Sequence, residues 1–137
     1  MNDPLDAHLA WFEALTPASL AAIDRVYAQG ARFRDPFNAL EGRDAIARLY
    51  ARMFERLDAP RFVVRERLHD GRRAFVTWDF EYGLAGRRHG LHGGTLFVLD
   101  EAGLIAEHRD YWDAAEGVYE RVPIVGGLLR CLKRRMA

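Results

Sequence analysis

The hydrophobic pattern of the chain changes its period close to residue 61, and this change constrains the fold more than any other feature. Before it, apolar side chains recur at i, i+3, i+4 and i+7, as in an amphipathic helix. After it, apolar and polar side chains alternate, as in a strand that buries one face. In a chain of 137 residues, this order predicts one α+β domain in which helices come first and hairpin-connected strands follow.

Two main helices are expected before the change. The first follows Thr16-Pro17-Ala18-Ser19, where proline takes the first helical position, and runs through Tyr27 to a stop at Gly30. The segment 9–12 could be a short helix or a packed arm, and 31–35 is an extended piece before Pro36. The second helix starts at 42–44 and ends at 58–60, with Tyr50 on its apolar face.

Four strands are expected after the change. The first covers 61–69 and ends at the hairpin signal Asp70-Gly71. An arginine-rich turn, 83–90, precedes a strand at about 91–99, and the turn 100–103 precedes the last strand. The hairpins predict a curved antiparallel sheet packed on the N-terminal helices. The second strand is expected to bury one face, made of Ala74, Val76, Trp78, Phe80 and Tyr82.

The last strand ends in an unusual run of charged and aromatic residues, Glu107-His108-Arg109-Asp110-Tyr111-Trp112-Asp113. Because strand side chains alternate, His108, Asp110 and Trp112 share one face. An imidazole, a carboxylate and an indole on one face are typical of a small-molecule site. A purely structural carboxylate–arginine pair at the strand end is the alternative.

Three blocks of sequence resemble the SnoaL-like branch of the nuclear transport factor 2-like superfamily. They are 33–38 with 41–46, 75–80, and 108–113, and the resemblance covers about residues 8–115. It implies a cone-shaped fold whose helices close a curved sheet around a deep apolar pocket, with homodimerisation through the outer sheet face common. Relatives include ketosteroid isomerase, limonene epoxide hydrolase, polyketide cyclases and non-catalytic binding modules, so the fold alone names no reaction.

Comparison with the epoxide hydrolases narrows the chemistry. Asp110 matches the position of their catalytic aspartate on the last strand. Their tyrosine and asparagine on the first short strand correspond to Phe33 and Asp35, and their arginine and aspartate on the middle strand to Trp78 and Phe80. Half of the water-activating residues are therefore absent, and an epoxide hydrolase of that type is not expected.

Asp110, His108 and Asp35 are the candidate catalytic residues. A carboxylate in an apolar pocket is desolvated, which raises its pKa toward the range useful for proton transfer; the alternative is that Asp110 only pairs with His108, an arginine or a backbone amide. His108 could orient Asp110 or protonate its partner, or form a structural hydrogen bond. Asp35 could be a polar group at the pocket mouth, or could organise the bend before Pro36.

The candidate ligand-binding residues are mainly aromatic and include Tyr27 and Tyr50, whose phenols could enter the cavity although aromatics at helical spacing are more often core. His92 has a weaker claim. Together with His108 and Asp110 it could in principle hold zinc, but diagnostic spacing is lacking and no metal is expected. No glycine-rich phosphate loop is present, so no organic cofactor is expected. The wall itself is assigned to Trp78, Phe80, Phe97 and Trp112.

Composition bounds the partners. The formal net charge is +0, so the chain has no overall field to recruit nucleic acid. Cys131 is the single cysteine, and neither a signal peptide nor a membrane span is evident, so a cytoplasmic protein is expected. Residues 1–122 form the expected domain, and 123–137 form a basic amphipathic tail that could lie on an anionic membrane but is more often packed or frayed.

These features together predict a small-molecule pocket protein. If it is an enzyme, it would isomerise, cyclise or dehydrate a hydrophobic substrate by proton transfer, with Asp110 as acid or base. The alternatives are a non-catalytic ligand-binding or dimerisation module, and an accessory protein that takes a ligand from a membrane through its basic tail.

Overall fold

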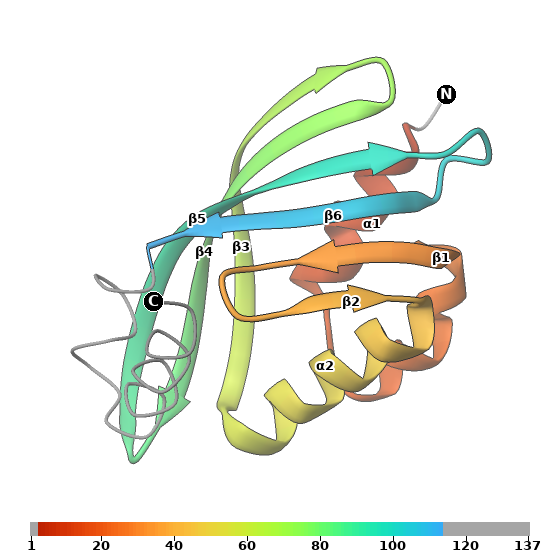
Figure 1. Ribbon diagram of the computed structural model, residues 1–137. Coiled ribbons are helices and arrows are strands. Elements are labelled where there is room, and N and C mark those ends of the chain that lie inside the picture. Colours follow the sequence, from red (N-terminus) through yellow and green to blue (C-terminus); the bar gives the residue numbers. More distant parts are fainter. Residues whose placement is uncertain (1–2, 114–137) are drawn as a thin grey trace, which may run out of the picture.

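The computed structural model describes residues 3–113, which form an α+β fold in which the helices lie against a curved six-stranded sheet (Figure 1). The sheet order is β2-β1-β6-β5-β4-β3. The helices are α1 (Pro4–Glu13), the 3-10 helix η1 (Ala18–Arg25) and α2 (Arg43–Arg56). The strands are β1 (Tyr27–Arg34), β2 (Ala39–Glu41), β3 (Asp58–Asp70), β4 (Arg73–Leu84), β5 (Arg87–Leu99) and β6 (Ile105–Trp112).

The sheet is not wholly antiparallel, because β1 runs parallel to β6. The other neighbouring pairs are antiparallel, as the hairpin signals predict. The parallel pair joins the first strand of the chain to the last one. It therefore brings the segment before Pro36 beside the charged and aromatic run on β6.

The first expected helix is wrong in its second half. The structure has a 3-10 helix that ends at Arg25, and Tyr27 begins β1 instead of closing a helix. The amide of Ile105 donates to the carbonyl of Val26, and Tyr27 pairs with Ile105. This pairing overrides the local helical spacing. The segment 9–12 belongs to α1, whose N-cap Asp3 accepts a hydrogen bond from the amide of Leu5.

The second expected helix is confirmed as α2, and its Ile46 and Tyr50 are buried. The arginine-rich segment 83–90 is not a loop. β4 continues to Leu84, β5 starts at Arg87, and the turn consists of Ala85 and Gly86, which both have a positive φ. Two residues of this backbone conformation make the tight hairpin turn whose twist matches the flanking strands.

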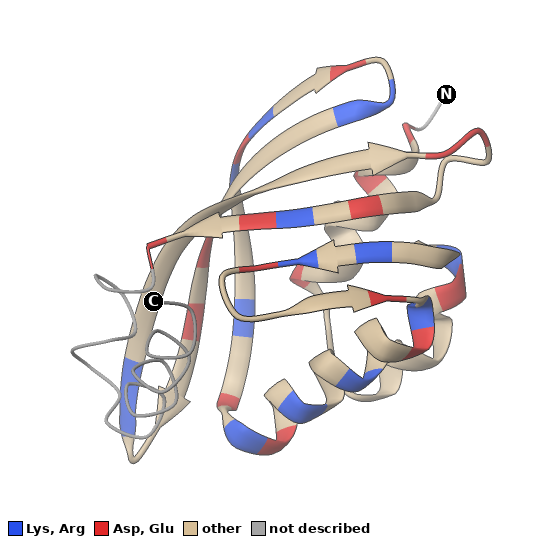
Figure 2. Ribbon diagram, in the orientation of Figure 1, with Lys and Arg blue, Asp and Glu red and all other residues tan. Residues whose placement is uncertain are grey.

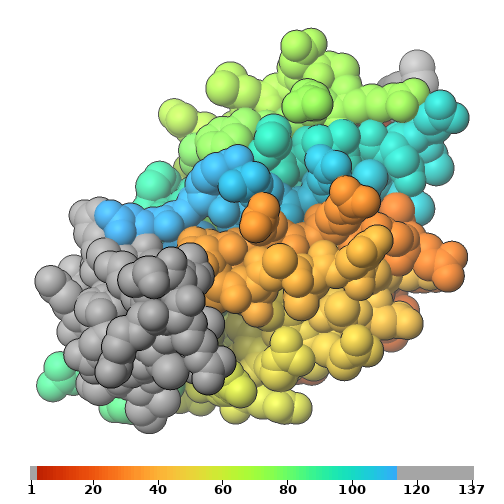
Figure 3. All heavy atoms as spheres, in the orientation of Figure 1, coloured from red at the N-terminus to blue at the C-terminus, as the bar shows by residue number. Residues whose placement is uncertain are grey.

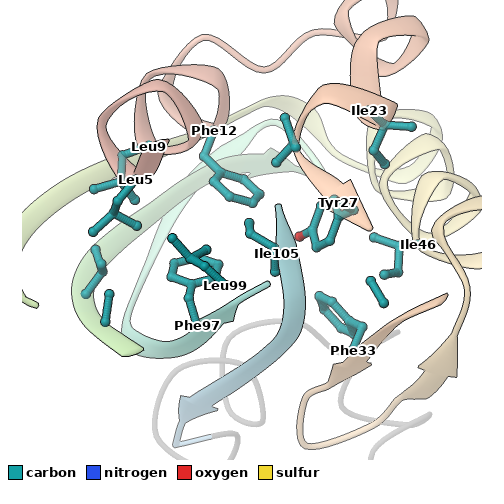
Figure 4. Close-up of a cluster of buried hydrophobic side chains, with 14 of the residues drawn as sticks. Leu5, Leu9, Phe12, Ile23, Tyr27, Phe33, Ile46, Phe97, Leu99 and Ile105 are labelled. Carbon is teal, nitrogen blue, oxygen red and sulfur yellow. The ribbon is translucent and has the colours of Figure 1, made fainter. Parts of the chain in front are cut away.

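The core fills the space between the helices and the inner face of the sheet, where side chains of α1, β1, α2, β5 and β6 converge (Figure 4). Polar contacts fasten α1 to the sheet. His69 Nδ1 lies 2.8 Å from Asp3 Oδ2, Arg67 pairs with Asp6, and His8 Nε2 lies 2.7 Å from the carbonyl oxygen of Gly103. The inner face of the sheet is thereby closed on one side by α1.

Charged residues of both signs are interspersed over the helices and strands (Figure 2). None of the described helices is long and apolar enough to cross a membrane. The end of the expected domain, residues 114–122, and the expected tail 123–137 with Cys131 lie outside the described residues.

Candidate functional site

The alternation predicted for the last strand is confirmed. On β6, His108 is buried and Asp110 and Trp112 are partly buried, whereas Arg109 and Tyr111 are exposed. The guanidinium of Arg109 lies over the Tyr111 ring, 5.2 Å from its centroid. β1 and β6 lie side by side on the surface seen in Figure 3. The inner face of β6 thus carries the imidazole and the carboxylate that the sequence assigns to a site.

Asp110 and His108 form a close pair inside the sheet. His108 Nε2 lies 2.7 Å from Asp110 Oδ1, and the Thr95 hydroxyl donates to the same oxygen. The indole Nε1–H of Trp78 donates to Thr95 Oγ1 at 2.8 Å. Both bonds to the carboxylate fall on Oδ1. The second oxygen, Oδ2, is therefore the one with acceptor capacity left for a ligand.

Two tyrosines continue the network on the other side of the imidazole. The Tyr27 hydroxyl lies 2.7 Å from His108 Nδ1 and 3.0 Å from the Tyr50 hydroxyl. Burial raises the pKa of both phenols, and the charge of Asp110 adds to this effect on each of them. Both hydroxyls are therefore protonated and can serve as donors. Tyr27, Tyr50, His108, Asp110, Thr95 and Trp78 form one continuous chain of hydrogen bonds that spans β1, α2, β6, β5 and β4.

An interior cavity of about 50 Å³ lies beside this chain. Asp110, His108, Thr95, Tyr50 and Trp78 line its polar part. Its remaining wall is apolar and comes from α1 and the inner sheet face, namely from Leu9, Phe12, Phe62, Val64, Val76 and Phe97. This volume is enough for water or for the reactive end of a small molecule. Pockets that hold a complete ligand usually have a volume of about 300–1,000 Å³.

A larger hollow of about 550 Å³ opens on the other side of Asp110. It lies where β1 ends, and its lining includes Asp35, Pro36, Asp110 and Trp112. Asp110 therefore borders both the interior cavity and the open hollow. A ligand in the hollow would meet the carboxylate without entering the core completely.

Asp35 has the turn geometry that the sequence offers as one alternative. Its Oδ1 accepts from the amides of Phe37 and Asn38 at 2.8 and 2.6 Å, and the Asn38 side-chain amide donates to both carboxylate oxygens. Burial nevertheless raises the pKa of Asp35, against these hydrogen bonds. Because Asp35 lines the hollow together with Asp110, its role in binding stays a prediction.

His92 lies apart from the other site residues. On β5 it is exposed on the outer face, where its Nδ1 is 2.7 Å from Asp79 Oδ1. His108 and Asp110 are on the inner face, so His92 cannot share an ion with them. Among residues 3–113, no group of three or more histidine, cysteine, aspartate or glutamate side chains is arranged to hold a metal ion.

The expected wall residues divide into two groups. Trp78, Phe97 and Tyr50 line the interior cavity. Phe80 and Trp112 belong to a second cluster with Leu91 and Phe37, and Trp112 lines the open hollow. Tyr27 is completely buried and contacts His108 through its hydroxyl, so its role in ligand binding stays a prediction.

Sequence reasoning missed Thr95, although a signal for it exists. Leu91, Phe97 and Leu99 mark the inner face of β5 by their odd positions, and Thr95 is the polar residue in that series. The contributions of Leu9 and Phe12 could not be found in this way, because they depend on how α1 packs across the sheet.

Solved structures with the same fold cover most of the chain. An NTF2-like protein of unknown function from Burkholderia pseudomallei K96243 is 18% identical, with a TM-score of 0.73 over 85% of this chain and 95% of that one. An LEH-like epoxide hydrolase from M. tuberculosis is 20% identical, with a TM-score of 0.72 over 84% and 81% of the two chains. A protein with a ketosteroid isomerase-like fold from Catenulispora acidiphila, in complex with trimethylamine, is 15% identical, with a TM-score of 0.71 over 86% and 91%.

These identities support the fold alone. No curated protein matches the chain. The model of the SnoaL-like domain, however, matches residues 8–108, which is most of the sequence and includes β1, α2 and the part of β6 that carries His108. The chain therefore belongs to the SnoaL-like domain family.

Proposed function

We propose that this protein binds a small hydrophobic carbonyl compound and catalyses proton transfer on it, with Asp110 as the general base and acid. The observation that carries the proposal is the position of Asp110 between the interior cavity and the open hollow. The carboxylate can meet a ligand there while protein donors hold its other oxygen. The relatives named for isomerase-like and hydrolase folds are consistent with such a site.

The surroundings of Asp110 suit proton abstraction next to a carbonyl group. Thr95 and His108 fix Oδ1, so the carboxylate has one orientation and Oδ2 accepts the proton. Apolar side chains such as Val76 and Phe97 exclude water from one side of the reacting atoms. Isomerisation, cyclisation and dehydration all begin with this step and need no cofactor.

The proposal can be tested with 3-cyclohexen-1-one as a small probe. Removal of its acidic C2 proton gives a dienolate, and return of a proton to C4 gives the conjugated enone. We expect the protein to accelerate deuterium incorporation at C2 in D₂O, followed by NMR. Asp110→Asn should reduce this rate by about 10²–10⁴-fold, whereas Asp79→Asn on the outer face should leave it unchanged.

Equal C2 exchange in the wild type and Asp110→Asn would refute the proposed function, and so would exchange no faster than in buffer. Folding of each variant is checked by circular dichroism. The Asp79→Asn variant controls for the loss of one carboxylate from a histidine pair, because Asp79 makes the same contact with His92 on the outer face.

A non-catalytic binding module is the second candidate. The small interior cavity and the two donors already on Asp110 favour it, since a carboxylate satisfied by protein groups needs no substrate. In that case the probe would bind near Trp78 and Trp112 without exchange at C2.

We also propose that the outer sheet face pairs with a second copy of the chain. The exposed large hydrophobic residues, Leu68, Phe75 and Tyr111, lie on β3, β4 and β6, and the rings of Phe75 and Tyr111 are 6.5 Å apart. Such patches mark contact surfaces. Sedimentation should show a dimer that Phe75→Asp converts to a monomer; a wild-type monomer at all concentrations would refute the pairing.

A further inference from the structure

The part of the hydrogen-bond chain that runs from Asp110 to Tyr50 has a property that a single acid–base residue does not need: both of its ends line the interior cavity. Asp110 lines the cavity at one end and Tyr50 lines it at the other. Between them, His108 and Tyr27 provide an unbroken path with heavy-atom distances of 2.7, 2.7 and 3.0 Å. Two points of one ligand can therefore contact two ends of the same path.

We propose that Asp110, His108, Tyr27 and Tyr50 form a proton relay that removes a proton from one atom of the ligand and delivers a proton to another. The inference rests on the proposed function and adds to it the class of reaction, a shift of a proton between two positions or an elimination. Tyr50 is then a second catalytic residue, which acts as the acid. Tyr27 is a positioning residue that connects Tyr50 to the imidazole.

The protons balance when the reaction starts from the Asp110 carboxylate and the His108 imidazolium. The ligand C–H bond breaks and a bond from that proton to Asp110 Oδ2 forms. At the same time His108 Nδ1–H passes its proton to Tyr27, Tyr27 passes its own to Tyr50, and Tyr50 donates to the ligand. The carboxylic acid and the neutral imidazole remain, with no net change of charge.

The environment of the tyrosines supports this direction. Tyr27 is completely buried and Tyr50 nearly so, and burial raises the pKa of both phenols. A free tyrosinate is therefore disfavoured, and Tyr50 can give up its proton only as it receives one from Tyr27. Asp110 also borders the open hollow, where its carboxylic acid can release the proton to solvent, and His108 lines a neighbouring hollow, from which it can take up a proton and become the imidazolium again before the next cycle.

Tyr27 connects the imidazole to Tyr50. His108 Nε2 binds Asp110, and the buried Nδ1 takes the Tyr27 hydroxyl as its partner. The same hydroxyl meets that of Tyr50 from α2, so the path continues beyond the group that pairs with the imidazole. The ring of Tyr27 is stacked on His108, with centroids 5.9 Å apart and an 18° angle between planes, which fixes their relative orientation.

Two measurements test the relay, and the first uses no ligand. With ¹³Cζ-labelled tyrosine, His108→Gln should shift the Tyr50 signal when Tyr27 is present. In Tyr27→Phe, which removes only the connecting hydroxyl, the same His108→Gln change should leave the Tyr50 signal constant. A Tyr50 signal that does not respond to His108→Gln, or that responds equally in Tyr27→Phe, would overturn the relay. Tyr111→Phe, on the outer face, is the control variant.

The second measurement separates the two ends with 3-cyclohexen-1-one in D₂O. Tyr27→Phe and Tyr50→Phe should keep C2 exchange but reduce deuteration at C4 relative to it, by roughly 10-fold or more. This ratio does not depend on the fraction of folded protein. An unchanged ratio in both variants would overturn the relay. Absence of C2 exchange in the wild type refutes the proposed function instead, and the tyrosine signals then decide the relay by themselves.

Discussion

The sheet carries two aspartate–histidine pairs with the same contact distance and opposite surroundings. His108 Nε2 and Asp110 Oδ1 are 2.7 Å apart on the inner face, and so are His92 Nδ1 and Asp79 Oδ1 on the outer face. The inner side chains are 5% and 16% exposed, and the outer ones 65% and 32%. The outer carboxylate also pairs with Arg65, whose Nε lies 2.6 Å from Asp79 Oδ2.

The surroundings, and not the contact within the pair, distinguish the proposed inner site from the outer pair. Solvent and an arginine compensate the charge of Asp79, and such surface pairs contribute only about 0.2–1 kcal/mol. The inner pair lies beside a cavity and connects to two protonated tyrosines. In the proposed relay, protons move there along hydrogen bonds between protein groups.

The largest difference between the pairs is expected in activity. His108→Gln removes the imidazole from the inner pair and should reduce C2 exchange of 3-cyclohexen-1-one by roughly 10²-fold, because general acid–base partners contribute at least about this much. His92→Gln makes the same change on the outer face and should leave the rate unchanged. A similar decrease of the exchange rate in both variants would contradict a special role of the inner pair.

A second difference is expected in the hydroxyl groups that support each face. Thr95 is buried between Trp78 and Asp110, so Thr95→Val leaves the Trp78 indole N–H unpaired and removes one of the two hydrogen bonds to Asp110 Oδ1. This loss should reduce the free energy of unfolding by about 1–3 kcal/mol. Thr77 accepts only from the amide of Glu66 at an exposed position. Thr77→Val should cost less than about 1 kcal/mol in urea unfolding; an equal cost would contradict the account.

Two adjacent glycines provide a steric test. A Cβ at Gly93 would lie 2.6 Å from the Trp78 ring, which is buried and held by its hydrogen bond to Thr95. Gly93→Ala should therefore destabilise the protein by about 1–3 kcal/mol. At Gly94 the Cβ would meet the tip of the Phe75 ring at the same distance, but Phe75 is exposed and can rotate. Thermal unfolding should show a smaller loss of stability for Gly94→Ala than for Gly93→Ala. A larger loss for Gly94→Ala would contradict the rigid packing of Trp78 on the inner face.

The smallest expected effect is the dependence of stability on pH that comes from the outer pair. The hydrogen bond from His92, and then that from Arg65, lowers the pKa of Asp79 below its ordinary value of 3.8. A lowered pKa means that the stabilisation is present above pH 3.8 and is lost as the pH falls through the folded value. The difference in unfolding free energy between the wild type and Asp79→Asn, about 1 kcal/mol or less near neutrality, should therefore shrink below pH 4. A difference that grows in acid would contradict this sign.

The sequence predicted the parts of the fold that depend on local pattern. The change of period located α2 and the strands β3, β4 and β5, and alternation put His108 and Asp110 on one face. It did not predict that Tyr27 starts β1, because that strand exists through its parallel pairing with β6, about 80 residues later in the chain.

The site was predictable to the same degree. The alternation of side chains along β5 is enough to put Thr95 on the inner face and His92 on the outer face. The prediction that His92 binds the ligand did not use this alternation. The approach of Tyr50 from α2 to Tyr27 on β1 and to His108 on β6 is a tertiary contact between three segments. No spacing within one element specifies such a contact.

The most direct test of the central claim is to record the side-chain N–H signals of both histidine pairs while 3-cyclohexen-1-one is added. We expect saturable shifts for His108 and for the Trp78 indole, which line the cavity, and constant signals for His92 on the outer face. Shifts at His92 with constant His108 and Trp78 signals, or no saturable shift at either pair, would contradict a ligand site at Asp110.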